Sequence, residues 1–231
     1  MIFGTRESYV MLMASLPALG PLLGSQTPSI SETRLRDRLG LLAPADRDNL
    51  DAMRTALDWS HLDLGETDEA FLDHIEKVMA RIESPELRNA VRDRLEIRTL
   101  VTALRRRASG KAAPGAAERW GYGRFLDTIR ARWSQPDFGL SQNFPWIKQA
   151  RERLEAGDVP GLERVVLQAA WDASGRHAAG HIFDFEAVAF YVERWSFADR
   201  WSRFDVAAAT TRFRELLDAA TNTPPAVETP A

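Results

Sequence analysis

The sequence of 231 residues predicts an all-α protein, folded as a compact bundle of about eight helices. Apolar residues recur every three or four positions through most of the chain, and no segment alternates apolar and polar residues for long enough to indicate a strand. Several of these periodic segments also begin with a capping residue followed by proline, which is typical of helix starts. We expect residues 1–220 to form a single helical domain and the proline-rich residues 221–231 to be a disordered tail.

The first apolar segment, residues 9–16, fits two structures. Its residues are almost all apolar and it ends at Pro17, so periodicity does not separate a buried strand from a buried helix. The Met, Leu and Ala content favours the helix. The longer apolar stretch of residues 9–23 is interrupted by Pro17 and Pro21, and it is too short and too broken to span a bilayer.

The first half of the chain then carries four expected helices, over residues 31–40, 44–57, 67–82 and 84–108. Ser31 and Ser84 are candidate N-caps, while Pro44 and Pro85 stand in first-turn positions. The expected buried residues of these helices are Leu35, Leu39, Leu50, Met53, Leu57, Phe71, Ile75, Val78, Met79, Ile82, Leu87, Val91, Leu95, Val101 and Leu104.

The second half carries further expected helices over residues 125–133, 147–157, 158–174, 184–201 and 205–220. Asp158, Asp184 and Asp205 are their candidate N-caps. Residues 109–117 and 134–145 are rich in Gly, Pro and polar residues, so we expect loops there.

Composition narrows the classes of function. Acidic and basic residues nearly balance, 33 against 30, for a formal net charge of −3. We therefore expect no nucleic-acid partner, because such a protein normally carries a basic excess. Only Lys77, Lys111 and Lys148 are lysines; the arginines that make up the rest suit ion pairs at contact surfaces, although genome base composition gives the same bias. The absence of cysteine excludes disulfides and Cys-ligated zinc, and it fits a cytoplasmic protein.

One group of residues is a candidate metal site. His177 and His181 are four residues apart and are followed by Asp184 and Glu186; on a helix the two histidines would share a face. Gly175 precedes the pair and Gly180 lies between the two histidines, however, so we expect a turn and a solvated loop there. We predict no catalytic residue, no metal and no cofactor, and keep a metal-dependent helical enzyme that uses these residues as an alternative.

Other candidate features favour structural roles. Arg105, Arg106 and Arg107 would suit a phosphate or an anionic lipid, but arginines at a helix C-terminus also complement the helix dipole. His61 and His74 are isolated, and the chain has no Gly-x-Ser-x-Gly motif of a serine hydrolase. The four rings of Trp195, Phe197, Trp201 and Phe204 are too many for one helix to bury against one neighbour. We expect that helix to lie in the centre of the domain, with exposure to a partner as the alternative.

Four parts of the chain, taken together and in order, carry a family resemblance. They are residues 9–17 (a Tyr-led apolar run that ends in Leu-Pro), residues 28–39 with 42–50, residues 137–140 (Asp-Phe-Gly-Leu), and residues 185–194 with 199–205 and 212–217. In these parts the chain resembles a bacterial family of uncharacterised proteins that are encoded with V-type ATPase subunits. That family is regarded as a counterpart of the C-type subunit of the ATPase central stalk.

This resemblance implies a helical adaptor that couples the rotating shaft of the soluble head to the membrane ring during ion transport, without binding nucleotide or doing chemistry. It implies shaft and ring subunits as partners and a peripheral place on the inner face of the cell membrane. The chain is shorter than C-type subunits built from three helical lobes, which implies that one lobe is reduced or missing. A free-standing helical scaffold or regulator is the alternative.

Overall fold

The computed structural model describes the backbone of residues 5–23, 28–58 and 68–221, and within these ranges it describes the side chains from residue 7 to residue 203. Within these ranges the regular structure consists of nine α-helices and no strand, which confirms the all-α prediction. The helices are α1 (Thr5–Ser15), α2 (Glu32–Leu39), α3 (Pro44–Leu57), α4 (Asp68–Met79), α5 (Pro85–Ala108), α6 (Leu126–Ala131), α7 (Ile147–Glu155), α8 (Val159–Ala178) and α9 (Phe185–Thr221).

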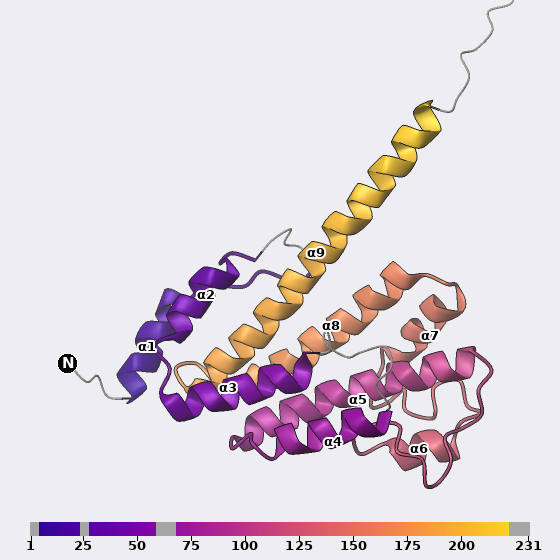
Figure 1. Cartoon of the computed structure of the whole chain (residues 1–231), viewed down its shortest axis with the longest axis horizontal. Coiled ribbons are helices and arrows are strands. Elements are labelled where there is room, and N and C mark those ends of the chain that lie inside the picture. Colours follow the sequence, from indigo (N-terminus) through magenta and orange to yellow (C-terminus); the bar gives the residue numbers. More distant parts are fainter. Residues whose placement is uncertain (1–4, 24–27, 59–67, 222–231) are drawn as a thin grey trace, which may run out of the picture.

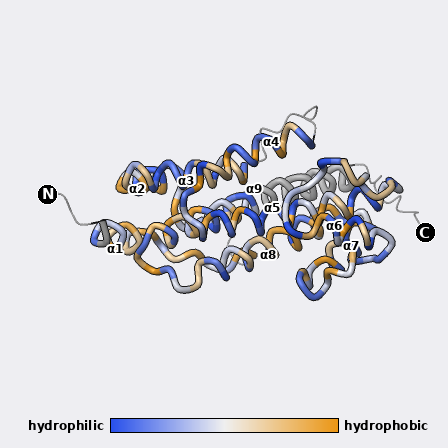
Figure 2. The backbone as a smooth tube through the Cα atoms, turned by 90° about the horizontal axis from the view of Figure 1, so that it is seen from below, coloured by the Kyte–Doolittle hydropathy of each residue, from blue (hydrophilic) through white to orange (hydrophobic). Residues whose placement is uncertain are grey.

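The helices are arranged around α5 and the first half of α9. α8 and α9 are joined by a short loop and pack as an antiparallel pair, and α9 also contacts α1, α3 and α5 (Figure 1). Figure 2 shows α2, α3 and α4 along one side of the molecule and α8 along the other, with α5 between them. α9 begins beside α1 and continues past the end of the packed helices (Figure 1).

Local capping explains where several helices begin. Ser31, Ser84, Asp158 and Asp184 all act as the N-caps that the sequence predicts. Their side-chain oxygens accept hydrogen bonds from the backbone N–H groups of Arg34, Leu87, Gly161 and Ala187, at 3.4, 3.3, 2.8 and 2.9 Å. Each bond satisfies one of the N–H groups that a helix leaves unpaired at its start.

The structure resolves one open alternative of the sequence analysis and corrects two of its predictions. Residues 9–16 lie on helix α1 and the following turn, so the strand alternative is wrong. The predicted break at Asp205 is also wrong, because α9 is continuous; its sequence holds no Gly or Pro, and helical propagation overrides a weak cap signal. The turn predicted from residue 175 begins only after Ala178, with Gly180 at φ 98°.

Gly175 stays helical for a packing reason. A Cβ at this position would lie 2.7 Å from Nη1 of Arg194 on α9, so the glycine leaves room for the Arg194 guanidinium over α8. The Arg194 guanidinium lies 3.8 Å from the ring centroid of Trp171, a cation–π contact across the same helix pair. Among the predicted core positions, Phe71 is only half-buried, and its neighbour Leu72 is buried instead.

The buried side chains form three clusters, and α5 contributes to all of them. Its first half packs Leu87, Val91 and Leu95 with α1, α3, α4 and the start of α9. Ile97 joins a second cluster with α8 and Phe197 of α9. Its last turns pack Leu100 and Leu104 against α7 and the segment between α5 and α7. α5 is therefore the helix that the three clusters share.

A loop that sequence reasoning missed docks tightly on α5. Thr99 Oγ1 donates a hydrogen bond to Tyr122 O at 3.0 Å and accepts one from Tyr122 N at 2.9 Å. One residue further along, Gly123 has φ 117°, and a Cβ there would overlap with Cγ of Glu96. The glycines on either side of Tyr122 thus allow the backbone to lie directly against the helix.

We expect Gly123→Ala to lower the free energy of unfolding by about 2–4 kcal/mol, because the added Cβ meets both an unfavourable φ and the buried Glu96. Urea unfolding followed by circular dichroism measures this change. Gly110→Ala is the matched control, because Gly110 also has a positive φ, 74°, but no heavy atom within 4 Å of its added Cβ. We expect the control to lose only about 1–2 kcal/mol. Equal losses would mean that the Gly123 loop is not held against α5.

Candidate functional site

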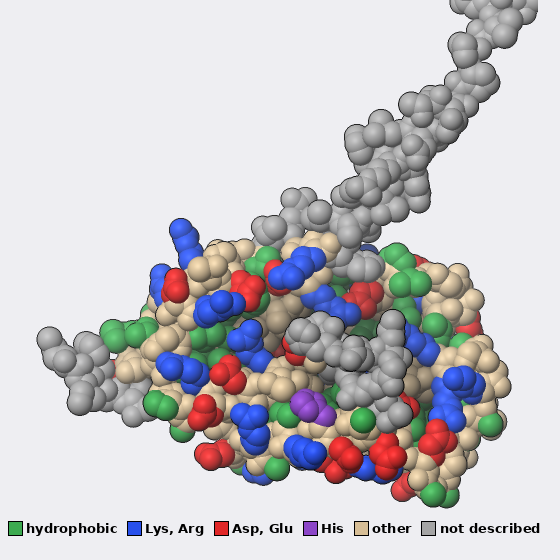
Figure 3. All heavy atoms as spheres, viewed as in Figure 1, with side chains coloured by type: hydrophobic (Ala, Val, Ile, Leu, Met, Phe, Trp, Pro, Cys, Tyr) green, Lys and Arg blue, Asp and Glu red, His purple; other side chains and the backbone are tan. Residues whose placement is uncertain are grey.

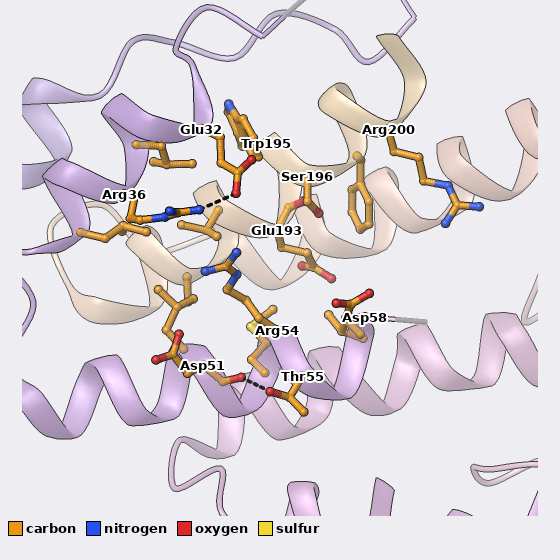
Figure 4. Close-up of a pocket in the computed structure, with 18 of the residues that line it drawn as sticks. Glu32, Arg36, Asp51, Arg54, Thr55, Asp58, Glu193, Trp195, Ser196 and Arg200 are labelled. Carbon is orange, nitrogen blue, oxygen red and sulfur yellow. Dashed lines mark hydrogen bonds and ion pairs between the residues drawn. The ribbon is translucent and has the colours of Figure 1, made fainter. Parts of the chain in front are cut away.

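A groove of about 780 Å³ lies between α2, α3 and α9, and Arg94 of α5 also lines it (Figure 4). It forms because α2 is only two turns long and is tied to α9 by a hydrogen bond that Trp195 Nε1 donates to Ile30 O at 2.8 Å. Its lining residues are Glu32, Leu35, Arg36, Leu39, Leu50, Asp51, Met53, Arg54, Thr55, Leu57, Asp58, Arg94, Ala189, Val192, Glu193, Trp195, Ser196, Phe197 and Arg200.

The groove has an apolar floor and a charged rim. Leu35, Leu50, Met53 and Val192 are buried in the floor, so its shape is set by the packing of the core. Two of the rim arginines form ion pairs. Arg36 pairs with Glu32 at 2.9 Å. Arg200 likewise pairs with Glu163, at 2.7 Å. Arg54 is exposed and points from α3 into the groove (Figure 4).

Two opposite charges are buried at the base of the groove. Arg94 of α5 is 7% exposed and Glu193 of α9 is 7% exposed; Ser174 of α8 donates a hydrogen bond to Glu193 Oε2 at 2.6 Å. Burial lowers the pKa of Arg94 to about 10, even though the charge of Glu193 opposes that shift. Burial also raises the pKa of Glu193, against the Ser174 hydrogen bond and the Arg94 charge. Desolvation therefore outweighs the attraction between the two ions.

A second polar network continues from this base along α5. His177 Nε2 lies 3.0 Å from Asp93 Oδ2, and Arg124 Nη2 donates to Asp93 Oδ1 at 2.7 Å and to the buried Glu96 at 2.8 Å. Burial alone would raise the pKa of Asp93, but the hydrogen bond and charge of His177 and the charge of Arg124 lower it below its ordinary value. The network fixes α8 and the docked loop to one face of α5.

The candidate metal residues are only partly brought together. His181 Nδ1 lies 2.8 Å from Asp184 Oδ2, and ligand atoms of His181, Asp184 and Glu186 all lie within 4.8 Å of one another. His177 does not join them, because its ring stacks on Phe190 and its Nε2 faces Asp93.

The three grouped side chains already have structural partners. The other oxygen of Asp184 caps α9, and Glu186 Oε1 accepts a hydrogen bond from Ser84 Oγ, the cap of α5, at 2.9 Å. The N-terminus of α9 also carries the positive end of the helix dipole, which opposes a cation at this place. Capping of α5 and α9 accounts for the positions of Asp184 and Glu186.

The arginine run at the end of α5 holds neighbouring loops. Arg106 pairs with Glu118, and Arg107 donates to the backbone carbonyls of Gln135 and Pro136. The Arg107 guanidinium also lies 4.4 Å from the ring centroid of Phe138, which is fully buried and has φ 54°. These contacts favour the structural interpretation of this run over an anion site.

The aromatic residues of α9 are mainly core residues. Trp195 and Phe197 are 7% and 5% exposed, while Trp201 is half-buried, so the central position expected for this helix is confirmed for its first half. The side chain of Phe204, His61 and the tail residues 222–231 lie outside the part of the chain that the structure describes.

Comparison with known proteins gives no relative: no family model, no curated protein and no solved structure matches the chain. None of the described helices is both long and apolar enough to cross a lipid bilayer. On the face shown in Figure 3, acidic and basic side chains are interspersed, unlike the one-sided basic patch of a nucleic-acid-binding protein.

The buried charge pair predicts that the stability lost on replacing Arg94 depends on pH. We expect Arg94→Met to lower the free energy of unfolding by about 3–5 kcal/mol near neutral pH, because Glu193 then ionises without its buried counter-charge. A carboxyl group whose folded pKa is raised contributes stability below its ordinary pKa and loses it as pH rises through the folded value. The loss caused by Arg94→Met should therefore be larger at about pH 8 than at about pH 5, as measured by urea unfolding.

Two controls test whether this loss comes from the interaction of Arg94 with Glu193. Adding Glu193→Gln to Arg94→Met removes the ionisable group, so the double variant should be more stable than Arg94→Met alone at about pH 8. Arg88→Met, on an exposed position of the same helix, should show a small loss that is the same at both pH values. A loss at Arg94 that does not change with pH would exclude coupling to Glu193.

Proposed function

We propose that this chain is a non-catalytic central-stalk adaptor of a bacterial V-type rotary ATPase, comparable to the C-type subunit of that stalk. In this role it binds the shaft of the soluble head and the membrane ring, lies peripherally on the inner face of the cell membrane, and binds neither nucleotide nor nucleic acid. The observation that carries the proposal is α9, a single helix of 37 residues that is about 55 Å long and extends beyond the other helices (Figure 1).

The form of α9 supports a force-bearing role. Its first half packs against α1, α3, α5 and α8, so it is held by most of the body. A continuous helix that leaves a packed body is a stiff connection, because bending it would break the hydrogen bonds of its backbone. An isolated helix is only marginally stable in water, so a partner that packs on the projecting half would stabilise it.

The resembling segments also support the proposal through their positions. Residues 9–17, 28–50 and 185–194 lie on or beside α1, α2, α3 and the first turns of α9, and their apolar residues share one buried cluster. The Asp-Phe-Gly-Leu segment forms a turn whose Phe138 is fully buried. Positions that lie in the core of a bundle determine its fold, so these segments support a fold like that of the resembling family.

Recovery of partners from the native host tests the assignment. The tagged chain, expressed at its native level and purified in mild detergent, should recover V-type ATPase shaft and ring subunits in fixed proportion by mass spectrometry. Recovery of the chain alone, or with unrelated proteins, would overturn the proposal and favour a free-standing scaffold.

A proline substitution tests the role of α9 in the same experiment. Thr211→Pro should break the projecting half of the helix, since proline in a helix interior costs about 3 kcal/mol or more, and should reduce recovery of the ATPase subunits at least about tenfold. Thr223→Pro makes the same replacement after the end of α9 and should recover the subunits normally. Equal recovery with both variants would mean that the partners bind elsewhere on the body.

A further inference from the structure

We propose that the groove between α2, α3 and α9 binds a small amphipathic monocarboxylate, with its apolar body on the floor and its carboxylate at Arg54. This is a ligand-binding function separate from the adaptor role, and neither depends on the other.

The size of the groove favours a small molecule. Its volume of about 780 Å³ falls within the range of about 300–1,000 Å³ that is typical of ligand pockets. Along α9 it extends from Ala189 to Arg200, a length of about 16 Å. A helix of that length, about 10 Å wide with its side chains, would occupy more than about 1,200 Å³, so a partner helix fits it less well.

The floor offers an apolar surface with aromatic edges. Leu50, Met53 and Val192 form its centre, and Trp195 and Phe197 add two large rings from α9. These side chains are fixed by the core and by the Trp195–Ile30 hydrogen bond, so the surface is preformed. A ligand that covers it gains hydrophobic free energy without having to order the floor first.

The charges of the groove select a single negative charge. Four arginines and four carboxylates line it, so the lining is balanced overall. Glu32 is already paired with Arg36, and Arg200 is paired with Glu163 outside the groove. Among the described residues, Arg54 forms no ion pair or side-chain hydrogen bond, and its guanidinium points into the groove (Figure 4).

The Arg54 guanidinium is the group that meets the ligand head, while Arg94 lies at the base of the groove beside Glu193. An arginine fork binds a carboxylate through two parallel hydrogen bonds, which makes this head group a good match. The rim carboxylates Asp51 and Asp58 would oppose a dianion such as a phosphate monoester more strongly than a monoanion.

Isothermal titration with dodecanoate, below the concentration at which it forms micelles, tests the site. We expect saturable binding of one dodecanoate per chain. Arg54→Gln should lower the affinity for dodecanoate at least about tenfold, since a charge-assisted hydrogen bond is lost. It should leave the affinity for the neutral analogue dodecanol unchanged. Arg34→Gln is the matched control, because Arg34 is exposed on α2 and does not line the groove.

A blocking variant locates the apolar part of the ligand. Ser196 is exposed on the groove wall, so Ser196→Phe should fill the space and weaken dodecanoate and dodecanol alike. Circular dichroism of each variant checks that the helices are retained. The proposal is overturned if the unmodified chain shows no saturable binding, if Arg54→Gln and Arg34→Gln have the same effect, or if Ser196→Phe binds both compounds normally.

Discussion

Burial of α5 by three clusters is the constraint on which the other helices depend. A helix with apolar neighbours on several sides hides its polar residues as well, and each of these needs a partner inside the protein. Thr99 uses the backbone of Tyr122, Glu96 uses Arg124, and Arg94 lies beside Glu193. Tyr122 and Arg124 belong to the loop before α6, and Glu193 belongs to α9. The polar residues of α5 therefore fix where the loop before α6 and the helix α9 can lie.

The same arrangement produces the groove. α9 must keep Glu193 near Arg94 and Ser174, so its first half lies along α5 and α8. α2 is held to the opposite face of α9 through Ile30 and Trp195, and α3 packs on α5. The space between α2, α3 and α9 is what these separate attachments leave unfilled. A charged pair at its base is thus a consequence of how the bundle is assembled.

Much of the fold could be predicted from the sequence because its signals are local. Ser84 followed by Pro85 marks the start of α5, and the apolar spacing that follows identifies its buried face; both depend on residues within one or two helical turns. The failures have a different origin. Asp205 is a reasonable local cap, yet α9 continues through it. Gly175 is a reasonable turn residue, yet it stays within α8, where the Arg194 side chain of α9 packs over it. In both places a longer-range preference overrides the local one.

The candidate site could not be predicted in the same way, because its parts are distant in the sequence. Arg94 and Glu193 come together only because α5 packs against α9, and no spacing rule in the sequence connects them. The histidine group shows the converse. His177 and His181 are close in sequence, but α8 ends between them, so one ring turns to Asp93 and the other to Asp184. Nearness along the chain suggested a site that the fold divides, and the groove that it builds instead is assembled from helices far apart in the sequence.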